Sequence, residues 1–281
     1  MIWGLWPVVF AGEACYNLPA EAFPGVSMPA PPGDGLSVLL TDWKRGWRPV
    51  PCAAQTNFNP GESLWVCLPL TLMGGFLDTY TYITRGGVFA NAQTGNMVLL
   101  AIRAAGGEWA AAAYYLVPIF AFALGVVVTE GLRARVPREA EVRWQSAVLL
   151  LEAAILGVAG LLPPEAPNPV VNVAVSFLCA MQVNSFRTVR GLPYASTMCT
   201  GNLRSGSQHL WRFLFRGDRE AGARAGSYLL VIFTFCLGAG LGVPLTGLLG
   251  VRSVLLWVPA LLWLRWRLGR KRRIDKEPAM G

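Results

Sequence analysis

The chain has 281 residues, of which 54% are hydrophobic and 14% charged, with a mean hydropathy of +0.44. Soluble domains carry about 25% charged residues, so this composition excludes an ordinary soluble enzyme and predicts a surface that faces lipid. The net charge of +8 does not indicate nucleic-acid binding, because seven basic residues gather at the C-terminal end, the usual cytoplasmic flank of a last membrane helix.

Residues 1–64 differ in composition from the rest of the chain. Proline and glycine are frequent there, as in Pro29, Pro31, Pro32 and Gly33, and no helical periodicity is present. Such a segment buries too little apolar surface to offset the entropy of ordering it. We therefore expect a disordered leader, and whether it belongs to the mature protein is left open.

Six apolar stretches follow, each about long enough to cross a hydrocarbon core that takes roughly 20 helical residues. They are 65–84, 109–129, 144–164, 166–186, 225–251 and 252–268. The last is short and relies on Arg265 and Arg267 reaching water from its end. The sequence therefore predicts an all-α polytopic membrane protein, with a basic cytoplasmic tail at 269–281.

The two halves of this region are related by an internal repeat. Thr94-Gly95-Asn96 recurs 106 residues later as Thr200-Gly201-Asn202, and Asp78 meets Asn184 at the same offset. A second block, 115–125, matches 228–238 at seven of its eleven positions. We expect a first membrane repeat over 65–164 and a second over 165–268. Matching glycines in the second block, Gly125 and Gly238, are expected to let helices pack closely.

Three spans in each half predict inverted topology, because an odd number makes the second half enter from the opposite side. With the N-terminus in the cytoplasm, 21 of the 24 basic residues lie inside, and only Arg85, Arg103 and Arg252 lie outside. The first TGN triplet is then outside and the second inside. In the alternative count, the motif segments also span, each half has four helices, and the repeats run parallel.

Asp78 lies well inside the first span, where a carboxylate is costly and faces protein or a water-filled cavity. Its repeat mate is Asn184, and Arg187 follows on the same helical face. One hypothesis is that Asp78 and Arg187 approach each other at the pseudo-twofold axis and line a polar path. The alternative is a structural ion pair or contacts at helix ends.

Thr94, Gly95, Asn96, Thr200, Gly201 and Asn202 are the next candidates. Glycine allows a break in the chain, and threonine and asparagine can cap a following helix, so the triplets either bind a solute or start a packed helix. Glu152 is alone in the third span and either titrates or bonds a polar residue such as Asn172 or Gln182. No residue set indicates a catalytic site, a metal site or a cofactor.

At these residues the chain resembles the YoaK-like family of uncharacterised bacterial membrane proteins, a domain-of-unknown-function family. The resemblance covers residues 65–268. It rests on the segments 74–78, Gly-Gly-Phe-Leu-Asp, and 88–96, Val-Phe-Ala-Asn-Ala-Gln-Thr-Gly-Asn, and on 182–187 and 197–202 in the second half. It implies a six-helix protein of the plasma membrane and no established activity.

The sequence thus favours a transporter or channel for a small polar solute or ion, with a path between two inverted repeats and both termini in the cytoplasm. Its expected partners are the lipid bilayer and that solute, without nucleic acid, and a homo-oligomer is left open. A membrane scaffold or assembly protein is the first alternative. The second, a membrane-embedded enzyme acting on a lipid-linked substrate, lacks a nucleophile, metal cluster or acid–base pair.

Overall fold

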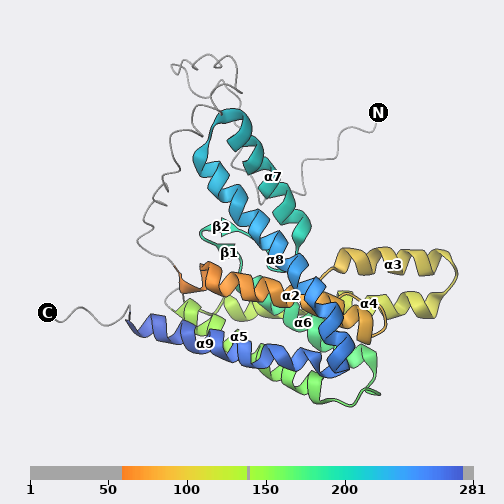
Figure 1. Ribbon diagram of the computed structural model, residues 1–281. Helices are drawn as coiled ribbons and strands as arrows, with labels where there is room; N and C mark the ends of the chain where they lie inside the picture. The colour runs from red at the N-terminus through yellow and green to blue at the C-terminus, as the bar shows by residue number, and fades with distance from the viewer. Residues whose placement is uncertain (1–58, 138–139, 275–281) are drawn as a thin grey trace. The chain divides into compact units, whose positions relative to one another are not determined.

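The computed structural model describes residues 59–137 and 140–274, and most of these residues are helical (Figure 1). The elements are η2 Pro60–Glu62, α2 Leu64–Thr84, α3 Gln93–Ala105, α4 Trp109–Arg133, α5 Glu141–Leu161, α6 Asn168–Ser185, β1 Thr188–Val189, β2 Leu192–Pro193, α7 Cys199–Arg216, α8 Arg219–Leu249, η4 Gly250–Leu256 and α9 Trp257–Ile274. The two strands form one short antiparallel hairpin. The fold is all-α, as the sequence predicts.

Each of the six predicted spans coincides with a helix, namely α2, α4, α5, α6, α8 and α9. The boundaries differ most in the second half. Helix α8 begins at Arg219, six residues before the predicted span, because the Asp218 side chain accepts a hydrogen bond from the Ala221 amide and caps it. Residues Gly250–Leu256 form the 3-10 helix η4, so α9 starts at Trp257 and not at residue 252.

The predicted leader and tail lie largely outside the described residues, which start at 59 and end at 274. The last part of the predicted leader is ordered and does not match the expectation of disorder. Asn59 caps η2 by accepting a hydrogen bond from the Gly61 amide at 2.9 Å, and Ser63 leads directly into α2. Helix α9 also continues past residue 268 to Ile274.

By length and apolarity, three helical stretches of the described residues could cross a membrane: Trp109–Arg133, Glu141–Leu161 and the continuous Arg219–Arg270. These stretches indicate a membrane protein. Helices α2 and α6 are outside this set, and they carry many of the buried polar residues, including Asp78, Asn172 and Gln182. Large apolar side chains are exposed mainly on the other helices, such as Phe120 on α4 and Phe233 on α8.

The helix pairing is unchanged when the two halves are exchanged. Helix α2 packs on α8, as α6 packs on α4; α3 lies along α4, as α7 lies along α8; and α5 packs on α9 (Figure 1). The repeat offsets relate α2 to α6, α3 to α7 and α4 to α8. Each half therefore buries its first helix against the other half, which places α2 and α6 at the interface between the repeats.

Glycines set the close approach at these crossings, as expected for small residues between membrane helices. A Cβ atom at Gly238 of α8 would lie 2.0 Å from the Leu72 carbonyl oxygen of α2, and one at Gly75 would lie 2.1 Å from the Phe235 carbonyl oxygen. On the matching α4–α6 crossing, a Cβ at Gly125 would lie 2.8 Å from the Phe177 carbonyl oxygen. Backbones touch at both crossings, so no side chain fits there.

Candidate functional site

The asparagines of the two TGN triplets make the same contact in both halves. Asn96 accepts a hydrogen bond from the Phe89 amide at 3.0 Å and donates to the Phe89 carbonyl at 2.8 Å. Asn202 accepts from the Ala195 amide at 3.4 Å and donates to the Ala195 carbonyl at 2.8 Å. Both side chains are buried. Each asparagine therefore holds the backbone of the residue seven positions earlier. The two residues held, Phe89 and Ala195, are themselves 106 positions apart, which is the offset of the repeat. We call these two contacts the asparagine clamps.

The threonines and glycines of the two triplets do not cap the helices that follow. Helices α3 and α7 begin at Gln93 and Cys199, again 106 residues apart, so the triplets lie inside the first turns and do not precede them. No side-chain cap forms at either start, and Thr94 and Thr200 are exposed. The predicted capping by threonine is wrong. Gly95 faces the Phe89 ring, whereas Gly201 has open space where a Cβ would lie.

Asp78 holds the segment that leads into α3. Its carboxylate accepts a hydrogen bond from the Asn91 amide at 2.7 Å, and the Asn91 side chain donates to the Gly74 carbonyl at 3.0 Å. The Asp78 side chain is buried. A carboxylate just before a helix start is favoured by the free amides and the positive end of the helix dipole. Asp78 thus has a positioning role in addition to any role in a path.

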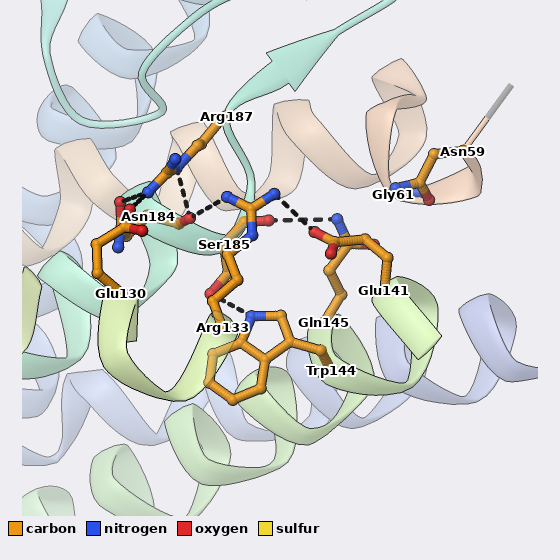
Figure 2. Close-up of polar contacts among 10 residues, drawn as sticks. All are labelled: Asn59, Gly61, Glu130, Arg133, Glu141, Trp144, Gln145, Asn184, Ser185 and Arg187. Atoms are coloured by element: carbon orange, nitrogen blue, oxygen red, sulfur yellow. Dashed lines mark hydrogen bonds and ion pairs between the residues drawn. The ribbon is translucent and has the colours of Figure 1, made fainter. Parts of the chain in front are cut away.

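Asn184 and Arg187 belong to a different cluster, which Figure 2 shows at the C-terminal end of α6. Arg187 pairs with Glu130 of α4 and donates to the Asn184 side chain. Arg133 donates to the Asn184 carbonyl at 3.1 Å and pairs with Glu141 at 3.0 Å. We call Glu130, Arg133, Glu141, Asn184 and Arg187 the latch.

The predicted approach of Asp78 to Arg187 is wrong. Asp78 bonds the Asn91 amide, and Arg187 pairs with Glu130 in the latch. The physical basis of the latch is the last turn of α6, whose carbonyls lack helical donors and attract cations. Next to it, Trp144 donates to the Ser185 hydroxyl at 3.1 Å and Gln145 donates to the Ser185 carbonyl at 3.2 Å (Figure 2). Partial burial lowers the pKa of the Arg187 guanidinium, which stays charged at neutral pH.

Glu152 of α5 is buried, with 1% of its surface exposed. Neither carboxyl oxygen has a hydrogen-bond partner within the described part of the chain. The predicted partners bond elsewhere: Asn172 donates to the Arg85 carbonyl at 3.0 Å, and Gln182 donates to the Ser196 hydroxyl at 2.9 Å. The structural alternative for Glu152, a hydrogen bond to one of these two amides, is therefore wrong.

A polar stripe runs along one face of α6 beside these acids. Asn172, Ser176, Cys179 and Gln182 follow at steps of four, three and three residues, which places them on one helical face, and all are buried. Helix α6 contacts both α2, which carries Asp78, and α5, which carries Glu152. The name polar stripe is used below for these four residues of α6.

Several atoms at this stripe are buried without a hydrogen bond among the described residues: Asn172 Oδ1, Ser176 Oγ and Gln182 Oε1, together with Asn91 Oδ1 and both Glu152 oxygens. Buried polar atoms are nearly always bonded, because an unmade bond costs about 1–3 kcal/mol. A bound water, ion or polar solute would find hydrogen-bond partners in such a run of unpaired atoms. Within the described ranges, no group of three His, Cys, Asp or Glu is placed to hold a metal ion.

Sequence reasoning missed part of this arrangement. Ser176 and Cys179 were detectable, because they continue the helical spacing between Asn172 and Gln182. Asn91 carried no signal of its own, since its contact with Asp78 depends on how the chain turns back after α2.

Comparison with known proteins gives a family and no activity. Residues 66–265, more than two thirds of the chain, match the family described as "Protein of unknown function (DUF1275)". No curated protein and no solved structure matches the chain.

Proposed function

We propose that this chain, which belongs to the DUF1275 family, is a membrane transporter or channel for a small polar solute or ion. The observation that carries the proposal is the polar stripe, whose buried unpaired atoms lie on a helix that contacts both α2 and α5, the helices of Asp78 and Glu152. A stripe of this kind is costly in a membrane protein unless water or a solute fills it.

The proposed architecture has six spans, α2, α4, α5, α6, α8 and α9, arranged as two inverted repeats in the plasma membrane with both termini in the cytoplasm. The exchange symmetry of the helix pairing supports it. The length of α3 argues against the parallel alternative, because its 13 residues reach about 20 Å at ~1.5 Å each, short of a core of about 30 Å. Helix α7 carries Arg204, Arg212 and Arg216 and suits a membrane surface better than its interior.

Within this proposal, α2 and α6 are the inner helices and the others face lipid. Asp78 and Glu152 supply the acidic groups of the path, and Asn172, Ser176 and Gln182 supply neutral polar contacts. The latch closes the cytoplasmic end of α6, and the Asn96 and Asn202 clamps fix the two motif segments. The Thr94, Gly95, Thr200 and Gly201 positions take part only through the backbone of the first helical turns.

The test uses the purified full-length protein in liposomes adsorbed on a capacitive electrode, challenged with steps of small cations, anions, amino acids and sugars. We expect a saturable signal that Glu152→Gln and Asp78→Asn each reduce at least about tenfold, since each removes a carboxyl group that can carry a proton or bind a cation. Glu165→Gln is the matched control, because Glu165 is an exposed loop carboxylate.

Two outcomes would count against the proposal. If Asp78→Asn and Glu152→Gln stayed folded and left every signal unchanged, neither acid would have a role in transport. If the wild-type protein gave no signal with any solute and captured a stable protein partner instead, the scaffold alternative would replace the transporter.

A further inference from the structure

The chain segments that precede α3 and α7 both contact Gly74 of α2. The Asn91 side chain donates to the Gly74 carbonyl at 3.0 Å. From the other half, a Cβ atom at Gly74 would lie 3.0 Å from the Thr197 methyl group and 3.2 Å from the Ser196 carbonyl oxygen. Asn91 and Thr197 occupy equivalent positions of the repeat, 106 residues apart, but differ in type. Because Gly74 has no side chain, both segments can lie against its backbone.

Gln182 of α6 reaches the same turn of α2. Its amide nitrogen donates to the Leu70 carbonyl at 3.2 Å and to the Ser196 hydroxyl at 2.9 Å. Leu70 and Gly74 are four residues apart in α2, so the Leu70 carbonyl lies beside the Gly74 amide. Side chains from both halves are therefore brought to one turn of α2.

Three oxygen atoms at this turn are buried and have no hydrogen-bond partner among the described residues: Asn91 Oδ1, Gln182 Oε1 and Thr197 Oγ1. The two amide orientations follow from their contacts, because a backbone carbonyl can only accept and each amide nitrogen must face one. Each amide oxygen is thus left as a free acceptor on the carbon that bears the bonded nitrogen. We call Asn91, Gln182 and Thr197 the oxygen cluster.

Asp78 supplies a negative charge beside the oxygen cluster. It follows Gly74 by four residues, on the same face of α2, and its carboxylate accepts a hydrogen bond from the Asn91 amide at 2.7 Å. Asp78 forms no ion pair with any residue that the structure describes. A buried charge is normally balanced by an opposite one, and a single carboxylate matches a single positive charge.

The chemistry of the donors selects the class of ligand. Carboxylate, amide and hydroxyl oxygens are the ligands that hard cations prefer, whereas thiolate and imidazole, which favour transition metals, are absent from the oxygen cluster and Asp78. In membrane transporters, polar groups next to unwound chain segments coordinate cations of this kind.

We propose that the oxygen cluster and Asp78 bind a monovalent alkali cation where the two motif segments meet α2. The amide and hydroxyl oxygens take the place of part of the hydration shell of the ion, and Asp78 balances its charge. That this ion is transported, or drives the transport of another solute, rests on the proposed function, whereas binding itself does not.

Binding is tested by thermal unfolding of the purified full-length protein in detergent. Lithium, sodium and potassium chloride are titrated at constant ionic strength against the chloride of the bulky cation N-methyl-D-glucamine. We expect at least one of the three alkali cations to raise Tm saturably, because a ligand that binds the folded state stabilises it. Asp78→Asn keeps an oxygen for the Asn91 amide but removes the charge, and should raise the half-saturating concentration about tenfold or more.

Thr197→Val distinguishes a ligand from a structural residue. The Thr197 hydroxyl bonds no described residue, so valine removes no protein contact, and Tm without alkali cations should stay the same or rise. The half-saturating concentration should nevertheless rise about tenfold, because a ligand of the cation is lost. Thr200→Val makes the same change at an exposed position of α7 and should keep the wild-type response.

The proposal is overturned if none of the three alkali cations stabilises the wild-type protein saturably, the result expected if water alone fills the oxygen cluster. It is also overturned if folded Thr197→Val or folded Asp78→Asn keeps the wild-type half-saturating concentration. Cation binding without flux of any solute would refute the proposed function alone, and flux without saturable cation binding would refute this inference alone.

Discussion

The two halves of the molecule agree at one motif position and differ at another. Asn96 and Asn202 clamp equivalent backbone segments with the same pair of hydrogen bonds. Asp78 and Asn184 are also at equivalent positions of the repeat, but their contacts differ. Asp78 accepts a hydrogen bond from the Asn91 amide in its own half, whereas Asn184 accepts one from Arg187 in the latch. The duplicated sequence thus keeps one contact and has diverged at the other.

This difference distinguishes residues that maintain the fold from residues that we assign to function. The asparagine clamps are the same in both halves, so we assign them a structural role, the placement of α3 and α7. The acids Asp78 and Glu152 and the unpaired atoms of the polar stripe have no such counterpart. We therefore expect substitutions at symmetric positions to change stability, and substitutions at asymmetric positions to change activity with smaller effects on stability.

The largest expected effect is at the two helix crossings between the halves, where matching glycines occur in both halves. Gly238→Ala should lower the free energy of unfolding by about 3 kcal/mol or prevent folding, because its Cβ would meet the Leu72 carbonyl at 2.0 Å. Gly125→Ala should act in the same direction with a smaller effect. Unfolding titrations in mixed micelles measure both. Gly240→Ala, with open space at its Cβ, is the control and should cost nothing measurable.

The asparagine clamps come next and test the symmetry itself. Asn96→Ala and Asn202→Ala each leave a partly buried amide and carbonyl unpaired, so each should cost about 1–2 kcal/mol, with the two values similar. The exposed neighbours provide matched controls, and Thr94→Ala and Thr200→Ala should stay within about 0.5 kcal/mol of the wild type. A loss of stability in only one of the two variants would show that the clamps are not equivalent.

The comparison of the two halves is tested further by exchanging the residue types at Asp78 and Asn184. Asp78→Asn keeps an oxygen for the Asn91 amide and should cost only about 1 kcal/mol, while solute signals in liposomes fall strongly. Asn184→Asp adds a carboxylate near Arg133 and Arg187 and should leave both stability and signals close to the wild type. Equal losses of signal in the two variants would show that the polar path is not confined to the Asp78 side.

The smallest effect is expected at the exposed pair of the latch. Arg187 and Glu130 are each about half exposed, so a double-mutant cycle with Arg187→Gln and Glu130→Gln should give a coupling free energy of at most about 1 kcal/mol. The same cycle measured in proteoliposomes tests closure, because a latch at the end of a path should change the rate of solute signals more than it changes stability. A coupling well above that value would mean that the pair is a major element of the fold.

Much of this fold follows from the sequence. Uncharged runs and helical length located α2, α4, α5, α6, α8 and α9 with boundary errors of a few residues, since apolar continuity is a local signal. The start of α9 was missed because nothing local distinguishes the 3-10 turns of Gly250–Leu256 from an α-helix. The correspondence of α3 with α7 came from the repeat alone.

The candidate site was less predictable, for a physical reason. Asp78, Asn96, Asn202 and Glu152 were found as polar residues in or beside apolar segments, which requires no knowledge of contacts. Pairings depend on how helices rotate and pack, so the predicted meeting of Asp78 with Arg187 was wrong. Arg85 was treated only as one of the few basic residues outside, because its burial becomes visible only once η4 packs over the end of α2.

The most direct test of the inverted arrangement is sided labelling of the two motif helices. Burial raises the pKa of the Cys199 thiol to about 11, so it forms little reactive thiolate at neutral pH. The exposed repeat mates Thr94 and Thr200 are better positions, each changed to cysteine in an otherwise cysteine-free chain and treated with an impermeant thiol reagent on intact cells and on inverted vesicles. We predict that Thr94→Cys reacts only from outside and Thr200→Cys only from inside. Reaction of both from the same side would contradict inverted repeats.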